Sequence, residues 1–217
     1  MQQKMLWIPI FSLMFLTATT TSAAVSGKTI AEKGNGKGAI ACMTCHGDQG
    51  QGNVAAAYPY LAGQPAGYIV RQLQDFAAKK RSSPVMAPFA SALSKDEINA
   101  VATYYSKLTA PTPADSSANK KIVSLGKTLA TQGKWSEGVP ACYQCHGDRG
   151  QGIAPNFPAI NGQPSAYLKK QLLHWKNNER NNDPVGLMKA IVSRLSAEDI
   201  DAVSQYLASQ SPVANKQ

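Results

Sequence analysis

Residues 41–48 read ACMTCHGD, and residues 141–148 read ACYQCHGD. Both stretches contain Cys-x-x-Cys-His, and the two copies lie 100 residues apart. Other segments return with nearly the same offset, including the Gly-Gln-Pro sequences at 63–65 and 162–164. Because self-similarity at a fixed spacing indicates a duplicated structural unit, we interpret the chain as a tandem repeat of a unit of about 90 residues.

The duplication predicts two domains with a connection between them. We expect residues 25–108 to form the N-terminal domain and residues 119–211 the C-terminal domain. Residues 109–118 contain two prolines and two consecutive serines, a composition that is typical of an exposed and fairly extended linker. A chain of 217 residues is long enough for two such domains.

Each unit has the sequence pattern of a helical domain. Apolar side chains recur at helical spacing across residues 66–81 and again across 166–180. Ser94 followed by Glu97 is a capping box that opens a further helix, and Ser196 opens the equivalent helix in the second unit. No run of alternating β-branched residues indicates a strand. The predicted fold class is therefore all-α, with two tandem helical domains and long loops rich in Gly and Pro.

The Cys-x-x-Cys-His motif matches the pattern of covalent c-type haem attachment. Two thiols separated by two residues can add to the two vinyl groups on one edge of a haem, and the adjacent imidazole can then ligate the iron. The sequence thus predicts two covalently bound haem c groups, each enclosed by one domain. The predicted attachment residues and proximal ligands are Cys42, Cys45 and His46 in the first unit and Cys142, Cys145 and His146 in the second.

Other uses of paired cysteines fit the sequence less well. A zinc ribbon places its two pairs about 15–20 residues apart, whereas these pairs lie 100 apart in duplicated units. A thioredoxin-like redox pair belongs to a βαβ context that this sequence lacks. Plain disulfides do not require a His after each pair.

A second axial ligand for each iron is predicted at a Met. Met86 follows His46 by 40 residues, and Met188 follows His146 by 42, so the two Met residues occupy matching positions in the repeat. Met43 lies inside the first attachment loop and cannot reach the opposite face of the haem. A Met that only fills a core is the alternative interpretation.

The two Met loops differ in composition. Pro84 and Pro88 flank Met86 and restrict its loop, whereas Gly186 precedes the second Met and loosens that loop. Lys189 follows the second Met directly and is a remote alternative ligand.

The N-terminus is predicted to be a targeting segment. Residues 1–24 contain Lys4, an apolar stretch over 5–16, and a run of small and polar residues that ends in a cleavage site. The apolar stretch is shorter than the roughly 20 residues that a membrane anchor needs. We therefore expect a cleaved signal peptide and a soluble protein exported to the periplasm, where haem c is attached in bacteria.

The chain is basic, with 22 Lys and Arg against 13 Asp and Glu and a formal net charge of +9. The longest block of basic residues has three members, and no block is interleaved with stacking aromatic residues, so we exclude nucleic acid as a partner. The charge instead favours docking on acidic patches of redox protein partners. The alternative is that the charge only aids solubility.

At these motifs the chain resembles the dihaem cytochrome c4 family over nearly all of the expected mature sequence. Residues 58–64 read YPYLAGQ and match a further motif of this family, and residues 157–163 read FPAINGQ and depart from it by Ile and Asn. The resemblance implies two class I cytochrome domains, with the haems meeting near the domain interface. It also implies that the carbonyl groups of Pro59 and Pro158 accept the Nδ1 protons of the ligating His residues.

The predicted function follows from the ligation. A six-coordinate His/Met iron has no vacant position, which suits outer-sphere electron transfer and raises the reduction potential. We expect a periplasmic electron carrier, with no catalytic residue, between a respiratory or dehydrogenase donor and a terminal acceptor such as a haem-copper oxidase. It would be soluble, or associated with membranes through its partners.

Two alternatives remain open at this point. One is a dedicated electron-accepting subunit of a periplasmic dehydrogenase, for example one that oxidises thiosulfate. The other is a dihaem redox enzyme, which needs an open or unusually ligated haem.

Overall fold

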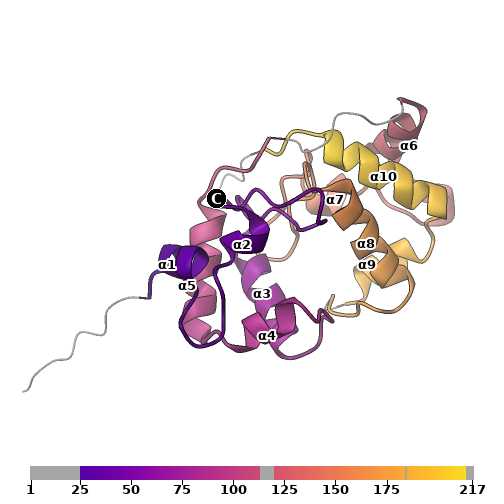
Figure 1. Ribbon diagram of the computed structural model, residues 1–217. Helices are drawn as coiled ribbons and strands as arrows, with labels where there is room; N and C mark the ends of the chain where they lie inside the picture. The colour runs from indigo at the N-terminus through magenta and orange to yellow at the C-terminus, as the bar shows by residue number, and fades with distance from the viewer. Residues whose placement is uncertain (1–24, 113–119, 184, 214–217) are drawn as a thin grey trace, which may run out of the picture.

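The computed structural model describes residues 25–112, 120–183 and 185–213, and within these ranges it contains helices and no strand (Figure 1). The all-α prediction is therefore confirmed. The first half contains α1 Gly27–Lys33, α2 Met43–His46, α3 Ala66–Ala77, α4 Met86–Ser91 and α5 Lys95–Ser106. The second half contains α6 Lys120–Thr131, the 3-10 helix η1 Trp135–Glu137, α7 Tyr143–His146, α8 Ser165–Lys176, α9 Leu187–Val192 and α10 Ala197–Ser209.

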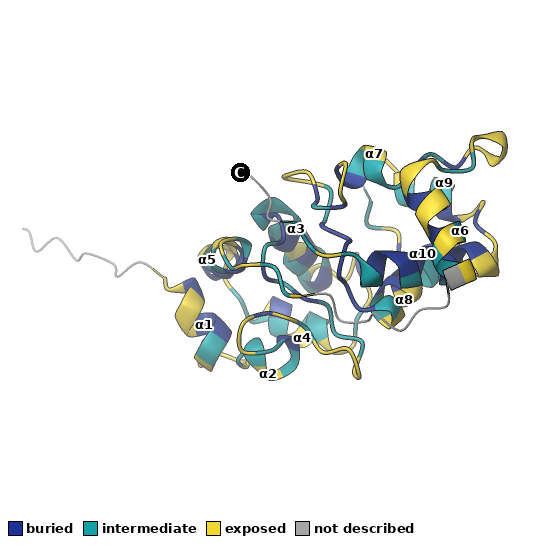
Figure 2. Ribbon diagram, turned by 90° about the horizontal axis from the view of Figure 1, so that it is seen from above, coloured by how far each residue is buried: buried dark blue, intermediate teal, exposed yellow. Residues whose placement is uncertain are grey.

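The two halves repeat the same helix arrangement. In the first half α1 packs on α5, and α3 packs on both α4 and α5. In the second half α6 packs on α10, and α8 packs on both α9 and α10. Each half has its own hydrophobic core, and Figure 2 shows the buried residues of α10 and the exposed residues on α6 and α9.

A glycine allows the first and last helices of each half to cross closely. A Cβ atom on Gly27 would lie 2.0 Å from the carbonyl oxygen of Ala100, and one on Gly126 would lie 2.2 Å from that of Ala202. Backbone atoms cannot give way, so only glycine fits at either crossing. Gly27 opens α1, whereas Gly126 lies inside the longer α6.

The helices predicted over 66–81 and 166–180 end earlier than expected. α3 stops at Ala77 and α8 at Lys176, because Lys79 and Asn178 adopt left-handed conformations with φ of 58° and 60°. A left-handed residue ends an α-helix. As a result the arginines at 81 and 180 leave the helical path and turn toward the junction between the halves.

The capping boxes hold the start of the last helix in each half. The Glu97 backbone N–H donates to the Ser94 hydroxyl, and the Glu97 carboxylate accepts from the Ser94 N–H at 2.7 Å. Ser196 and Asp199 make the same pair of bonds at α10. Both starts therefore lie where the sequence predicted them.

Two predicted segments lie wholly or partly outside the described residues. The signal segment 1–24 is not among them, and of the linker 109–118 only residues 109–112 are described, without a regular element. Among the described helices, none has both the length and the apolar character needed to cross a membrane.

Candidate haem sites

A one-turn helix carries the attachment motif in each half. Cys42 precedes α2, and His46 ends it. Cys142 and His146 occupy the same positions at α7. None of the four motif cysteines forms a disulfide, so each pair is available to add its S–H bonds across two vinyl groups. The described residues contain no group of three or more His, Cys, Asp and Glu side chains that could hold a metal ion.

Each motif His is held by a hydrogen bond to a proline carbonyl. His46 is 7% exposed, and its Nδ1 lies 2.9 Å from the Pro59 oxygen. His146 is also 7% exposed, and its Nδ1 lies 2.9 Å from the Pro158 oxygen. Because the proline oxygen can only accept, Nδ1 carries the proton and Nε2 keeps its lone pair for a metal.

The buried setting keeps both imidazoles neutral. Burial lowers the pKa of His46 and of His146, and it outweighs the opposing effect of the proline carbonyl bonds. A neutral imidazole is the form that ligates a metal ion. Burial also raises the pKa of Cys142 to about 11, which keeps that thiol protonated.

The loop after each motif folds back on the segment that carries the proline. The Gly52 N–H donates to the His46 carbonyl at 2.7 Å, and the Leu61 N–H donates to the Gly50 carbonyl at 2.7 Å. Equivalent bonds join Gly152 to His146 and Ile160 to Gly150. These bonds fix the proline carbonyl relative to the imidazole that it contacts.

The predicted Met ligands lie at the start of a short helix in each half. Met86 is the first residue of α4 and Met188 the second of α9, and both side chains are half-buried. The Met86 N–H donates to the Ser83 hydroxyl at 3.1 Å, and the Met188 N–H donates to the Asp183 carboxylate at 2.7 Å. In Figure 1, α2 lies above α3 and α4 below it, so the His-bearing and Met-bearing helices are separated.

The alternative ligand Lys189 is exposed. Its backbone N–H lies 3.4 Å from the same Asp183 carboxylate that accepts from the Met188 N–H. The residue thus belongs to the outer side of the α9 turn.

A pair of buried arginines joins the two halves, and the sequence interpretation missed its role. Arg81 is 7% and Arg180 4% exposed, and an isolated antiparallel bridge connects their backbones. Among the described residues neither guanidinium forms an ion pair with a carboxylate. Burial opposes ionisation of Tyr68, yet the two guanidinium groups outweigh it and lower the pKa of that phenol. The matching positions of the arginines in the repeat were the signal that could have revealed them.

Aromatic rings lie beneath both guanidinium groups. Arg180 sits 3.9 Å from the centre of the Trp175 ring, and Arg81 sits 4.6 Å from the centre of the Phe76 ring. Within the described part of the chain the Trp175 indole N–H is buried and has no hydrogen-bond partner. Haem carries two propionate groups, which would supply both the missing acceptor and the missing negative charge. The residues present therefore fit a haem.

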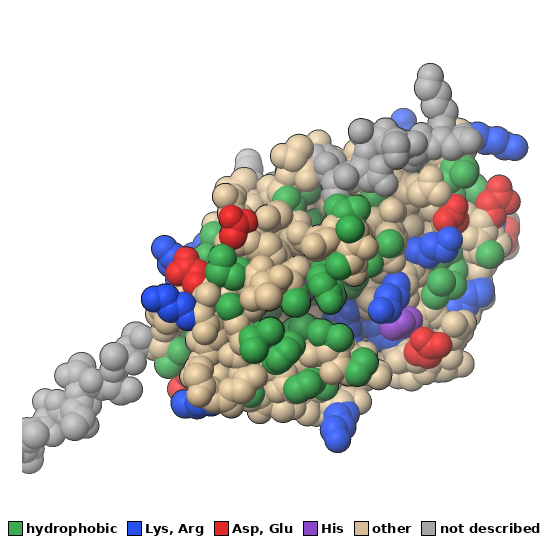
Figure 3. Space-filling model, viewed as in Figure 1, with side chains coloured by type: hydrophobic (Ala, Val, Ile, Leu, Met, Phe, Trp, Pro, Cys, Tyr) green, Lys and Arg blue, Asp and Glu red, His purple; other side chains and the backbone are tan. Residues whose placement is uncertain are grey.

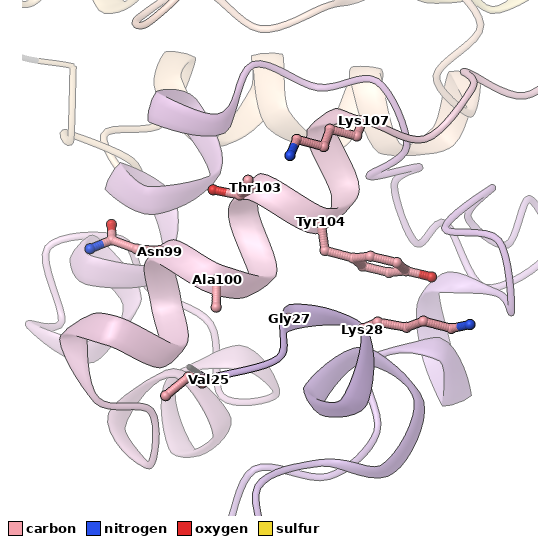
Figure 4. A pocket seen from close by; sticks show the side chains of 8 residues that line it. All are labelled: Val25, Gly27, Lys28, Asn99, Ala100, Thr103, Tyr104 and Lys107. Atoms are coloured by element: carbon pink, nitrogen blue, oxygen red, sulfur yellow. The ribbon is translucent and has the colours of Figure 1, made fainter. Parts of the chain in front are cut away.

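A hollow surrounded by hydrophobic side chains opens on the face shown in Figure 3, with Lys and Arg side chains along one side. A separate surface pocket lies between α1 and α5, and Figure 4 shows Lys28 and Tyr104 extending along it. That pocket is lined by Val25, Gly27, Lys28, Asn99, Ala100, Thr103, Tyr104 and Lys107. It contains no Cys, His or Met and is distinct from the haem sites.

Comparison with known proteins places this arrangement in a family. Residues 123–211 match the family described as cytochrome c, and residues 29–104 match subunit III of the cbb3-type cytochrome c oxidase. Cytochrome c4 of Thiocapsa roseopersicina is 40% identical over 81% of this chain and 90% of its own. The chain belongs to the dihaem cytochrome c4 family.

Two further relatives are similar to this chain. The thiosulfate dehydrogenase electron acceptor of Thiomonas intermedia is 43% identical, over 79% of each chain. The crystal structure of reduced recombinant cytochrome c4 from Pseudomonas stutzeri is 30% identical, with a TM-score of 0.75, and covers 85% of this chain and 96% of its own. The predicted fold of two tandem cytochrome c domains is confirmed, and so are two covalently bound haem c groups. The protein transfers electrons to and from redox proteins and is a carrier, not an enzyme.

Proposed function

We propose that each domain holds a six-coordinate haem whose iron is ligated by one His and one Met. His46 and Met86 would ligate the first iron, and His146 and Met188 the second. The observation that carries this assignment is the 2.9 Å contact between Nδ1 and a proline oxygen in both halves. It leaves a neutral Nε2 lone pair at each attachment motif. When bound, haem supplies the iron whose one-electron oxidation and reduction the protein uses.

The thiols of each motif would hold the haem covalently. Cys42 and Cys45 would form two thioether bonds in the first domain, and Cys142 and Cys145 would do so in the second. Each bond forms when S–H adds across a vinyl double bond, so no oxidant is consumed. Pro59 and Pro158 orient the imidazoles and increase their basicity.

Side-chain hydrogen bonds to the backbone of each Met support the proposed Met ligands. Ser83 and Asp183 stand at matching positions, and each accepts the backbone N–H of its Met. The second half has two additional residues between Asp183 and Met188, and the Asp183 carboxylate still reaches the Met188 N–H. Conservation of this bond across an insertion favours a positional role for the thioether over simple core filling.

The protein would relay single electrons through two haems in the periplasm after cleavage of residues 1–24. Full coordination excludes inner-sphere chemistry with small molecules, and His/Met ligation favours a high potential. One route would run from a dehydrogenase or respiratory donor to a terminal acceptor such as a haem-copper oxidase.

A second, narrower role is favoured by one relative. The thiosulfate dehydrogenase electron acceptor of Thiomonas intermedia is as similar to this chain as a cytochrome c4 is. We propose a periplasmic thiosulfate dehydrogenase as the specific donor, and we propose that an acidic patch on that enzyme docks on this basic protein. The excess of basic residues over acidic ones supports that charge complementarity.

Stopped-flow absorbance of the oxidised dihaem protein tests both roles. With catalytic amounts of a thiosulfate dehydrogenase and excess thiosulfate, both haems should become reduced, and the rate should fall as salt is added. A parallel reaction uses a respiratory donor, the quinol-oxidising cytochrome bc1 complex. Reduction only by that complex would reject the thiosulfate role and leave the general carrier, while equal rates at all salt concentrations would reject acidic docking.

A further inference from the structure

The Gly-Gln-Pro sequences form the part of the repeat that haem attachment does not explain. Their glutamines, Gln64 and Gln163, are 2% and 4% exposed and lie just before α3 and α8. Among the described residues, the hydrogen bonds of these two side chains are not made within their own halves. Both cross the junction and bind backbone groups of the other half.

Each glutamine binds one residue at two points. Gln163 accepts from the Tyr60 N–H at 3.1 Å and donates to the Tyr60 carbonyl at 3.0 Å. Gln64 accepts from the Ala159 N–H at 3.0 Å and donates to the Ala159 carbonyl at 2.9 Å. Tyr60 and Ala159 directly follow the two prolines that contact the motif histidines.

The Tyr60 N–H and the Pro59 carbonyl are the two ends of a single peptide group. One end donates to Gln163, and the other accepts from His46 Nδ1 at 2.9 Å. A continuous hydrogen-bonded chain therefore runs from the Gln163 oxygen through one peptide plane to the His46 imidazole. The peptide between Pro158 and Ala159 makes the equivalent chain, from Gln64 to His146.

Hydrogen bonds in such a chain strengthen one another. An acceptor on the peptide N–H polarises the amide and makes its carbonyl oxygen a better acceptor. A better acceptor at Nδ1 raises the basicity of the imidazole at Nε2, as outer partners of metal-bound His residues do. A more basic imidazole stabilises ferric over ferrous iron and lowers the reduction potential.

We propose that each glutamine is a positioning residue for the haem of the opposite domain. Gln163 polarises and orients His46, and Gln64 does the same for His146. The proposal rests on the proposed ligation of the irons by these histidines. It makes each potential dependent on a side chain from the other half of the repeat.

Substitution of one glutamine tests the crossed dependence. Gln163→Met keeps the length of the side chain and removes both bonds to Tyr60. The potential of the first haem should rise by at most ~59 mV, which for one electron is a tenfold fall in its ferric-to-ferrous ratio at a fixed applied potential. The potential of the second haem should not change. Gln64→Met should raise the second potential and leave the first.

Spectroelectrochemical titration of the dihaem protein gives the two potentials, and proton NMR of the haem methyl groups assigns each one to its domain. Asn156→Ala is the matched control. It removes an exposed hydrogen bond between the halves, from Arg71 to the Asn156 amide at 2.5 Å, and leaves intact the two hydrogen-bonded chains that join a glutamine to a histidine. Both potentials should stay unchanged in this control.

Several results would overturn the proposal. These are an unchanged first potential in Gln163→Met, a shift of the second haem in that variant, or equal shifts in the Asn156→Ala control. If Gln163→Met does not fold, Gln163→Glu replaces it, since its carboxyl group still accepts from the Tyr60 N–H. The first potential should then stay or fall, and a rise would reject the proposal. If the irons of the wild type were not low-spin and ligated by His, that result would instead reject the proposed function.

Discussion

Arg81 and Arg180 come from opposite halves of the chain, yet their guanidinium groups bind the same two side-chain oxygens. Arg81 donates to Gln72 at 2.8 Å and to Gln171 at 2.7 Å. Arg180 donates to Gln171 at 2.8 Å and to Gln72 at 3.0 Å. Neutral amide and phenol oxygens accept from the two guanidinium groups but do not compensate their charge. Buried charges without a counter-charge are costly, so we expect the anionic propionates of the bound haems to lie close to this pair.

Removal of one of these charges should lower the potentials of both haems. Arg81→Met takes away a buried positive charge at the junction, which favours the ferric state by on the order of 1 kcal/mol. Spectroelectrochemical titration measures both values. Lys80→Met is the control, because Lys80 is exposed and its charge is screened by water and salt. Equal effects of the two substitutions would contradict a role for the buried pair.

Each predicted Met ligand should account for one half of a spectroscopic signal. Ferric His/Met haem has a weak near-infrared charge-transfer band, and Met86→Ala or Met188→Ala should each remove about half of it. Either variant should also allow carbon monoxide to bind one ferrous haem, because a coordination position opens. Met43→Ala, in the first attachment loop, should leave the band intact. Rapid carbon monoxide binding to the wild type would mean that an open site already exists.

The Met188 loop depends on a glycine that the Met86 loop lacks. Gly186 has φ of 65°, so Gly186→Ala should cost about 1 kcal/mol of folding free energy and weaken the near-infrared band of the second haem. Gly36→Ala is the matched control, since Gly36 has φ of 67° and both positions have open space for a Cβ. The control should lose the same stability in urea unfolding and keep the band. A reduced band in both variants would contradict a local effect on Met188.

Acid should remove the stability that the first capping box supplies. The Ser94 N–H, followed by the Asn35 amide, holds the pKa of Glu97 below its usual range, against the effect of burial. A carboxyl whose pKa is lower in the folded than in the unfolded protein stabilises the folded state at pH values above its unfolded-state pKa. That stabilisation is lost as the pH falls through the folded-state pKa. Glu97→Gln should therefore cost about 1 kcal/mol at pH 7 and flatten the acid limb of the stability curve.

Urea unfolding of the dihaem protein across acidic pH measures this effect. Asp96→Asn provides the control, because Asp96 carries the same charge in the same helical turn and is exposed. That variant should change stability less and keep the shape of the acid limb. A curve for Glu97→Gln parallel to that of the wild type would show that the box does not titrate.

Much of the fold was predictable because the repeat states each signal twice. The capping residues Ser94 and Ser196 and the helical periodicity give local signals in the sequence. The predicted ends of α3 and α8 were wrong, since Lys79 and Asn178 adopt left-handed conformations without being glycine. Asn favours this conformation at the end of a helix, but Lys has no such preference, so the end of α3 had no local signal in the sequence.

The haem attachment motifs were also predictable, because they are contiguous in sequence. The junction was not, because its contacts join residues about 100 positions apart whose side chains have ordinary polar chemistry. Gln72 and Gln171 read as surface residues of amphipathic helices. Only the folded pairing of the halves shows that they are buried between two charges.

The crossed glutamine bonds have the geometry of an isologous dimer, in which each partner offers the same patch and receives the same group. The linker makes this association intramolecular, so the pairing does not depend on protein concentration. The two halves of one chain can also differ in sequence at equivalent positions, which the identical subunits of a homodimer cannot. The Tyr60 hydroxyl donates to the Asn161 carbonyl at 2.8 Å, while Ala159 at the equivalent position has no such group. The two halves of one chain can therefore carry different residues at equivalent positions of the junction, which makes the two electron sites distinct.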